Sequence, residues 1–253
     1  MIEPPRRTSD IIRAPHGFFG RAGGVSEAPL EGLNASLASG DNQARVIENR
    51  ARVAHALNAD HLLTAKQTHG AQAVFVSEPF AFEDRPEADG LVTDRPGLAL
   101  GALAADCTPV LLEAPGLVAA LHAGWKGSLA GIIEGTVAMM EAHGANRSDI
   151  RAAVGPCLRR DSFEVREDLL DSVCSKHPEA DRHLTKRDEE HWLYDHAAFV
   201  HDRLIAAGLQ PDHIDDTGGD TLTAEEDYFS YRGARRAGLQ QFGHNVSAIA
   251  LPR

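Results

Sequence analysis

Two continuous apolar runs near the middle of the chain predict buried strands. Residues 98–105 (LALGALAA) and 117–121 (LVAAL) are too uniform for an amphipathic helix and too short to cross a membrane. This pattern is typical of strands covered on both faces. Between them, 108–113 (TPVLLE) continues or restarts the first strand, and a Pro-Gly pair predicts a turn. The runs lead into Cys107 and His122, so a thiol and an imidazole lie where buried strands give way to loops.

Shorter patterns on both sides predict an alternation of strands and helices. Asp41 or Asn42 is suited to cap a helix ending near Leu57, and a 3.6-residue apolar period predicts another over 128–143. The other expected elements are strands at 71–76, 89–93, 150–154 and 245–251 and helices over 163–173 and 192–207. Expected loops or short late strands are 16–26, 78–88, 181–190, 214–217 and 228–232. The alternation predicts the α/β class, in which functional groups gather at strand ends.

Length and charge narrow the class of protein further. A chain of 253 residues can bury a large core, and we expect one domain over 1–253 with a polar lead-in at 1–14. With 25 basic and 37 acidic residues, the net charge of -12 disfavours nucleic acid as a partner. No run approaches the length of a membrane span, so no membrane partner is expected.

Cysteine usage indicates a reducing compartment. Three cysteines at wide spacings do not form a disulfide framework, and the first residues lack the apolar run of a signal peptide. We therefore expect a cytoplasmic protein. Cys157 and Cys174 are interpreted as packed side chains.

Three soft ligands together predict a metal site. Cys107 or His122 alone is ambiguous, but His69 lies in a third loop, within KQTHG at 66–70. One cysteine and two histidines suit zinc with a fourth position open to water, whereas a structural zinc wants a fourth protein ligand. The set therefore predicts an open, catalytic type of site.

Neighbouring residues supply further candidates. Asp106 is expected either to act as an acid or base, or to have a structural role. The stretch HAGWKGS at 122–128 predicts a cradle for an anion at a helix start, with Lys126 nearby and Trp125 stacking on a base or forming an apolar wall. Three histidines at five-residue steps diverge around a helix and are interpreted as surface residues, namely His191, His196 and His201.

A series of short motifs resembles one family in content and order. These are HGFFGRAGGVS, GLN at 32–34, GDNQARVIENR, KQTHG, ADGLVTD, ADCTPVLL, HAGWKG, VGPC, FEV and YFSYR. The chain resembles the YfiH-type family, also called the laccase-domain or multicopper polyphenol oxidase family. The resemblance covers about residue 15 to the C-terminus, and ADC followed by HAGW is its most specific part.

The resemblance implies a fold, a metal and an activity. The family fold is a single layered α/β/β/α domain with mixed sheets, and its zinc ligands match His69, Cys107 and His122. The family is associated with phosphorolysis of adenosine, inosine, guanosine and 5′-methylthioadenosine and with adenosine deamination. Substrate contacts are expected among cations and polar residues in or beside the motifs, namely Asn34, Arg50, Lys66, Tyr231 and Arg232. A solvated helical position is the competing interpretation of Arg50.

Two departures from the family pattern lie near the C-terminus. Asp220-Thr221 stands where the family often has Cys-Thr, and 233–238 (GARRAG) replaces the usual run after the YFSYR motif. The role of the divergent loop 233–244 is therefore open.

Other functions remain as alternatives. A copper-dependent polyphenol oxidase would need paired imidazoles, commonly His-x-His, and none of the 13 histidines forms such a pair, although a His2Cys site can bind copper. A hydrolase with Cys107 as nucleophile and a non-catalytic binding module are the others. The expected partners are purine nucleosides and phosphate, and the expected assembly is a monomer or a homodimer.

Overall fold

The three central strands form as their uninterrupted apolar sequences dictate. The computed structural model describes residues 3–253, with β6 at Leu98–Ala104, β7 at Thr108–Ala114 and β8 at Leu117–Ala123. All residues of these strands are buried except the half-buried Glu113. Strand β6 ends before residues 105–107, and the chain then enters β7, which belongs to the other sheet. Cys107 therefore lies where the chain crosses between the two sheets.

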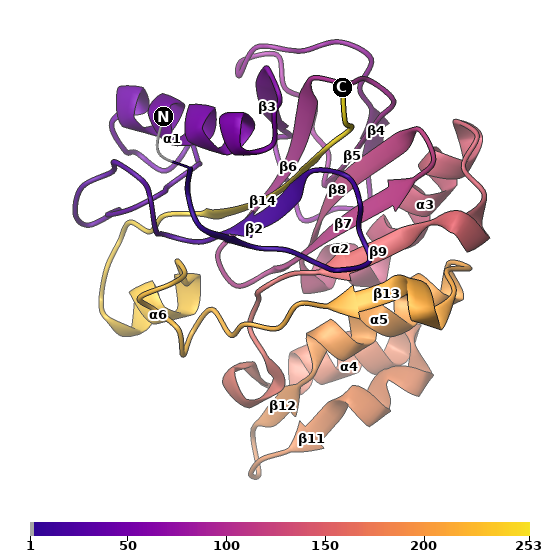
Figure 1. Ribbon diagram of the computed structural model, residues 1–253. Helices are drawn as coiled ribbons and strands as arrows, with labels where there is room; N and C mark the ends of the chain where they lie inside the picture. The colour runs from indigo at the N-terminus through magenta and orange to yellow at the C-terminus, as the bar shows by residue number, and fades with distance from the viewer. Residues whose placement is uncertain (1–2) are drawn as a thin grey trace.

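Two mixed sheets hold most of the strands (Figure 1). The five-stranded sheet has the order β1 (Arg6–Arg7), β2 (His16–Phe19), β14 (Asn245–Ala250), β6, β3 (His61–Thr64), and only β3 and β6 pair in parallel. The six-stranded sheet has the order β13 (Ile214–Asp216), β9 (Arg151–Val154), β7, β8, β5 (Gly90–Thr93), β4 (Ala73–Phe75). Its edge pairs, β13 with β9 and β4 with β5, are parallel and the others antiparallel.

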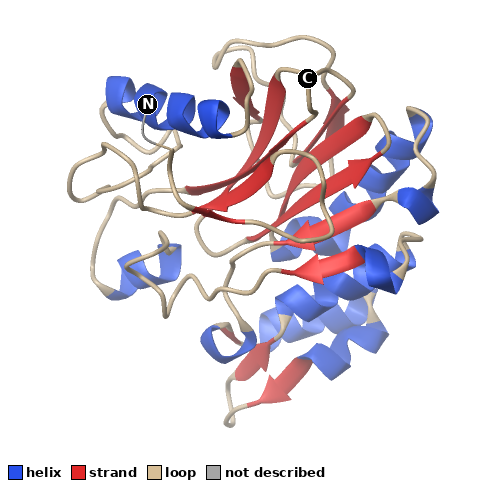
Figure 2. Ribbon diagram, in the orientation of Figure 1, coloured by secondary structure: helices blue, strands red, loops and turns tan. Residues whose placement is uncertain are grey.

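The two sheets pack face to face, and helices cover their outer faces (Figure 2). Leu100, Leu111 and Val118 contribute to the core between the sheets. Helix α1 (Gln43–Ala56) packs on the five-stranded sheet, and α3 (Ile132–Ala142) and α5 (His196–Ala206) on the six-stranded one. The predicted α/β class and the layered α/β/β/α arrangement with mixed sheets are therefore confirmed.

A smaller unit extends from one end of the six-stranded sheet. It contains the sheet β10 (Glu164–Val165), β12 (Trp192–Tyr194), β11 (Leu184–Lys186), helix α4 (Glu167–Lys176) and the 3-10 turn η3 (Pro178–His183). Its apolar core includes Leu169, Val173 and Phe199. The short helices α2 (Trp125–Ala130) and α6 (Tyr231–Arg236) and the 3-10 turns η1 (Arg147–Asp149), η2 (Arg160–Ser162) and η4 (Pro211–His213) complete the elements.

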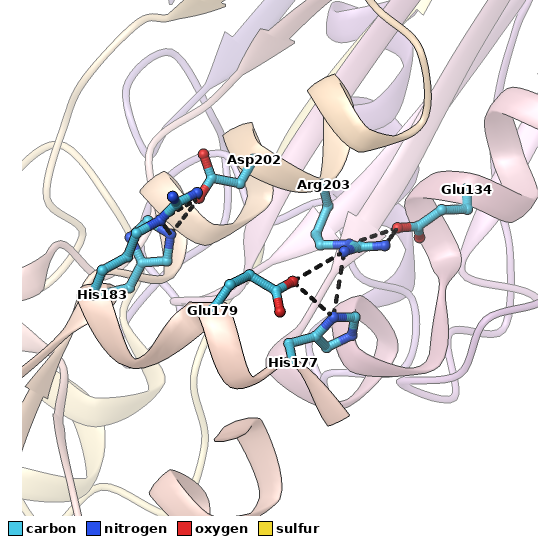
Figure 3. Close-up of polar contacts among 7 residues, drawn as sticks. Glu134, His177, Glu179, His183, Asp202 and Arg203 are labelled. Atoms are coloured by element: carbon cyan, nitrogen blue, oxygen red, sulfur yellow. Dashed lines mark hydrogen bonds and ion pairs between the residues drawn. The ribbon is translucent and has the colours of Figure 1, made fainter. Parts of the chain in front are cut away.

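Charged side chains join this unit to the helical layer (Figure 3). Arg203 of α5 donates from Nε to Glu134 of α3 at 2.6 Å, and its Nη1 lies 3.7 Å from Glu179. On the preceding residue of α5, the Asp202 carboxylate pairs with His183. The contacts of Glu179 and His183 fix the small unit against α5, which matters because Phe163, the residue directly before β10, lines the cleft described below.

Several expected elements differ in the structure. The helix expected over 128–143 is broken at Gly131, where φ is 97°. The helix expected over 192–207 begins only at His196, because Asp195 caps it and the preceding residues form β12. Stretches expected to be loops contain β2, β11 and the start of α6, since short strands and helices carry too few residues to show a period.

The expected polar lead-in also belongs partly to the fold. Arg6–Arg7 pairs with β2, and Ile12 and Ala14 are buried in the core between the sheets. Residues 1–2 lie outside the described part. Within residues 3–253, no helix has the length and apolarity that a membrane crossing requires.

Candidate metal centre and its cleft

The three predicted ligands meet at one point. His69 comes from the loop after β3, Cys107 from the crossover between sheets and His122 from β8. Their ligand atoms all lie within 4.8 Å of one another. The two imidazole rings are perpendicular, at 89°, with centroids 4.7 Å apart. The sequence therefore identified a group that the fold brings together from three separate segments.

The loop that carries His69 is held from two sides. The side-chain amide of Gln67 donates to the Leu103 carbonyl at 2.7 Å and accepts from the Leu103 N–H at 2.8 Å, which ties the loop to β6. On the other side the Asp89 carboxylate accepts the backbone N–H groups of Thr68, His69 and Gly70, at 2.8 to 3.1 Å. These bonds hold His69 at a φ of 59°, a left-handed conformation that non-glycine residues adopt only under such constraint.

Asp89 also orients His122. Its Oδ1 accepts from Nδ1 of that ring at 2.8 Å, leaving Nε2 for a metal ion. Burial favours the neutral acid, but bonds from His122, Gly70 and Thr68 lower the pKa of Asp89 to about 2. The sequence analysis assigned Asp89 no role. The available signal was a carboxylate directly before a fully apolar strand, where an unpaired charge would be costly.

The electrostatics favour an ionised thiol. Burial opposes a charge on Cys107, but the charge of His122 and hydrogen bonds from His122 and His69 lower the pKa of the thiol to about 6. Burial likewise opposes a charge on His122, while Cys107 and Asp89 raise its pKa to about 9. The pair therefore tends toward thiolate and imidazolium, and the thiolate is the form that binds metals.

Gly124 leaves no spare volume beside the ligands. A Cβ at this position would lie 3.1 Å from His69 Cδ2, 3.3 Å from Cys107 Sγ and 3.4 Å from His122 Cε1. The glycine after His122 thus lets the start of α2 approach all three ligands.

The donor set fits a soft or borderline metal ion. Zinc binds cysteine thiolate at about 2.3 Å and histidine at about 2.0 to 2.1 Å, in a tetrahedron whose fourth position stays open in catalytic sites. A thiolate with two imidazoles also suits copper. Within residues 3–253, His69, Cys107 and His122 are the one group of three or more His, Cys, Asp or Glu side chains gathered closely enough to hold an ion.

The triad lies in a cleft of about 930 Å³. The cleft has aromatic walls and a concentration of positive charge unusual for so acidic a chain. The aromatic lining residues other than histidine are Trp125, Phe163, Tyr231 and Phe242, and the basic ones are Lys66, Arg85, Arg232, Arg235 and Arg236.

Four of the predicted substrate residues line this cleft and three do not. Lys66, Trp125, Tyr231 and Arg232 belong to its walls. Lys66 is exposed and pairs with Glu87 at 2.7 Å. The Arg232 guanidinium donates to the carbonyl oxygens of Ser162 and Glu164, so this side chain also holds the opposite wall in place.

Arg50 has a structural environment instead. Its guanidinium donates to the carbonyl oxygens of Ala35 and Leu62 and to the Thr64 hydroxyl, within the packing of α1 against the sheet. Burial, with a smaller contribution from the charge of Arg85, lowers its pKa to about 10. Arg50 is thus half-buried outside the cleft, where its guanidinium satisfies backbone carbonyls.

Asn34 and Lys126 also lie outside the lining. Asn34 is fully buried, and its amide bonds Ser39, Asp41 and the backbone of His244. Lys126 is exposed, with its ammonium 5.5 Å from the centroid of the Trp125 ring. The predicted cradle at the start of α2 therefore presents Trp125 to the cleft, and its lysine points elsewhere.

Asp106 anchors the C-terminal segment. Its Oδ1 accepts from the hydroxyls of Thr221 and Ser230, at 2.8 and 2.7 Å, and its Oδ2 from the Arg232 N–H at 2.6 Å. Both oxygens are thus engaged although the residue borders the cleft. Of the roles that the sequence left open for Asp106, these bonds favour the structural one over orienting a histidine ring or acting as an acid or base.

His196 was wrongly expected at the surface. It is 2 % exposed and borders the cleft, with Nδ1 3.0 Å from the Thr108 hydroxyl and Nε2 3.1 Å from the Ser128 hydroxyl. Burial and the nearby charge of His122 lower its pKa to about 3. The helical spacing argument failed because His196 is the first residue of α5 and faces the sheet.

Comparisons with known proteins agree with this geometry. Fold and site define a layered α/β/β/α protein with a His2Cys group whose geometry could hold a metal ion. The chain belongs to the family described as multi-copper polyphenol oxidoreductase laccase, whose profile matches residues 15–252. This finding confirms the resemblance stated from the motifs.

Relatives and solved structures extend the match over nearly the whole chain. "Purine nucleoside phosphorylase ORF3" of Streptomyces griseus is 38% identical over 242 residues, covering 92% of this chain and 94% of that protein. A purine nucleoside phosphorylase of Deinococcus radiodurans is 37% identical, covering 96% and 91%. The crystal structure of YlmD from Geobacillus stearothermophilus superposes with a TM-score of 0.86 at 29% identity, covering 97% and 94%.

The role of Asp89 predicts a loss of metal affinity on substitution. Asp89→Asn should weaken zinc binding by about 10- to 100-fold, because an amide holds the His122 ring and the 68–70 amides less well than a carboxylate does. Competition with a chromophoric chelator measures this. Asp94→Asn, at the other end of β5 and exposed, is the matched control and should bind like the wild type. Equal affinity in all three proteins would show that Asp89 does not orient the ligand.

The same carboxylate predicts a pH dependence of stability. Asp89 has a pKa of about 2 in the fold against 3.8 as the reference, so its contribution is complete above about pH 4 and is lost as the pH falls toward 2. The difference in free energy of unfolding between metal-free wild type and Asp89→Asn should therefore shrink as the pH falls from about 4 toward 2. Urea unfolding across this range tests it, and a constant difference would contradict it.

Proposed function

We propose that this protein is a zinc-dependent purine nucleoside phosphorylase that also deaminates adenosine. The observation that carries the proposal is the position of the His2Cys group in a cleft that combines aromatic walls with basic side chains. Such a cleft suits a substrate with a planar ring together with an anion.

The anion fits the charge distribution. Lys66, Arg85, Arg232, Arg235 and Arg236 border the cleft, and Asp106, whose oxygens are already engaged, is its one acidic lining residue among residues 3–253. Within the same range, Arg85 and Arg236 have no ion pair. Inorganic phosphate would gain charge-assisted hydrogen bonds from such side chains.

The reaction needs positioning more than covalent help. An oxygen of phosphate attacks C1′ of the ribose as the bond from C1′ to the purine nitrogen breaks, and the purine leaves with the electron pair and takes up a proton. Basic side chains that hold the anion beside C1′ lower the entropic part of the barrier and stabilise developing charge. Adenosine, inosine, guanosine and 5′-methylthioadenosine are the proposed substrates.

Deamination would use the metal centre. Water replaces the amino group at C6 of adenine, and ammonia leaves. His69, Cys107 and His122 would hold a zinc ion, which when bound would lower the pKa of water and so supply a nucleophile near neutral pH. Asp89 keeps the His122 ring in the orientation that this requires.

The relatives support the phosphorylase part of the proposal. Proteins named purine nucleoside phosphorylase match at 36 to 38% identity over at least 90% of this chain. The copper oxidase alternative is less well supported, because a multicopper centre needs several ligand groups and residues 3–253 gather one.

A cysteine hydrolase is favoured by one specific observation. The Asp89 carboxylate orients the His122 imidazole, and this ring lies beside the ionised thiol of Cys107. The same arrangement occurs in enzymes with a cysteine nucleophile. His69 favours the metal site, because it brings a second imidazole to the Cys107 sulfur, whereas a cysteine nucleophile needs only one imidazole as its base. Metal content and alkylation of Cys107 separate the two functions.

Removal of the thiol should abolish both metal binding and deamination. In Cys107→Ala, zinc by elemental analysis should fall from about one per chain to near zero. Conversion of adenosine to inosine should fall by at least about 100-fold. Cys174→Ala, which changes a cysteine on α4 outside the cleft, is the control and should match the wild type. A Cys107→Ala protein that keeps its zinc would refute the triad. A wild type that binds no zinc and is inactivated by alkylation of Cys107 would favour the hydrolase.

Two unpaired cations should govern phosphate binding. Arg85→Gln and Arg236→Gln should each raise the KM for phosphate in inosine phosphorolysis by about tenfold, because each removes a charge-assisted hydrogen bond. The KM for inosine and the zinc content should change little. Arg95→Gln, an exposed arginine outside the cleft, is the matched control. If neither variant changes the phosphate KM, the anion does not bind at this rim.

A further inference from the structure

Tyr231 of the YFSYR motif and the divergent loop 233–244 together supply a continuous aromatic wall to the cleft. Tyr231, Phe242 and His244 all belong to the lining. The Tyr231 and Phe242 rings lie 5.1 Å apart at 69°, and the Phe242 and His244 rings 5.0 Å apart at 36°. The guanidinium of Arg235 lies 5.1 Å from the Tyr231 ring centroid and 5.8 Å from that of Phe242, which stiffens the wall further.

The backbone of His244 is fixed before any ligand binds. Its N–H donates to Asn34 Oδ1 at 3.1 Å, and its carbonyl accepts from the Ala35 N–H at 3.3 Å. The next residue, Asn245, begins β14 and bonds both the N–H and the carbonyl of Phe229 through its side-chain amide. The position of the His244 ring is therefore set by a buried loop and a central strand.

The ring itself lacks a partner. Nδ1 of His244 is buried and has no hydrogen-bond partner within residues 3–253. Burial and the charge of His122 lower the pKa of this histidine to about 4, so the imidazole is neutral at physiological pH and can donate from one nitrogen and accept at the other. A buried polar atom without a partner costs free energy, and a ligand that supplies the partner recovers it.

We propose that His244 hydrogen-bonds the edge of the purine base and that Phe242 and Tyr231 form the surface on which this base stacks. This inference rests on the proposed function and extends it by assigning base recognition to the segment in which the chain departs from its family. A neutral imidazole beside aromatic rings suits a planar heterocycle with hydrogen-bonding edges. The phosphate is expected to bind the basic side chains that line the cleft, and the ribose has no aromatic face that could stack on the wall.

The location agrees with the chemistry proposed for the base. His244 lines the same cleft as the metal triad, and the charge of His122 reaches it. A base held at His244 would thus lie beside the His2Cys group, as deamination at C6 requires. Asn34, which was expected to contact the substrate, would act on the base only through the backbone of His244.

The test separates the base from the rest of the substrate. Binding of hypoxanthine and of ribose 1-phosphate to zinc-quantified protein is measured by titration calorimetry for the wild type, His244→Ala and His244→Gln. We expect His244→Ala to bind hypoxanthine at least about tenfold more weakly, with unchanged affinity for ribose 1-phosphate and unchanged zinc content. His244→Gln, which keeps a hydrogen-bonding group, should recover part of the loss, and it serves as the readout if the alanine variant folds poorly.

A matched control lies in the chain itself. His213 also has a buried Nδ1 without a partner in the described residues, but it lies in η4, outside the cleft. His213→Ala should leave both affinities unchanged. Equal losses for hypoxanthine and ribose 1-phosphate in His244→Ala, or no loss for hypoxanthine, would overturn the inference. Base binding that depends on His244 in a wild type without phosphorolysis would retain the base site and refute the proposed reaction instead.

Discussion

The buried carboxylate of Asp89 is the interaction on which the site depends. It accepts three consecutive backbone N–H groups from the loop that carries His69, the hydroxyl of Thr68, and the Nδ1 proton of His122. One side chain thus sets the positions of two metal ligands that come from separate segments. Strand β5 begins at the residue after Asp89, and its backbone hydrogen bonds with β8 fix its place in the sheet. The precision of the centre therefore derives from the rigidity of the sheet.

A second carboxylate organises the other side of the cleft. Asp106 adjoins Cys107 and holds the segment with Thr221, Ser230 and Arg232 through three short bonds. Arg232 in turn donates to the carbonyls of Ser162 and Glu164, which flank the lining residue Phe163. Metal ligand, cationic rim and aromatic wall are therefore parts of one bonded assembly. Among residues 3–253 the cleft is lined by five basic side chains and one acidic side chain, so it is positive within a chain of charge -12.

Sequence reasoning predicted the parts of this arrangement that depend on local pattern. The apolar runs gave β6 and β8 and located Cys107 and His122 at their ends, because buried strands need uninterrupted apolar sequence. The loop motif gave His69. Partners that depend on tertiary packing were not predictable in this way. The bonds of Arg50 to backbone carbonyls exist only once α1 packs on the sheet, so the sequence of the helix does not show them. His196 faces the interior because Asp195 caps α5 and makes His196 its first residue. The divergent loop offered no period, so its helix and its histidine appeared only in the structure.

The place of β14 in its sheet ties assembly of the cleft to closure of that sheet. The strand lies between β2 and β6, which do not pair with each other, so the five-stranded sheet has a gap until residues 245–250 enter it. The segment just before this strand brings Phe242 and His244 to the cleft. Pairings of such long sequence separation form late, because the intervening chain must first be ordered. Before residues 245–250 enter, the folding chain would thus hold an incomplete sheet and an incomplete cleft together, and closing the sheet would complete the cleft in the same step.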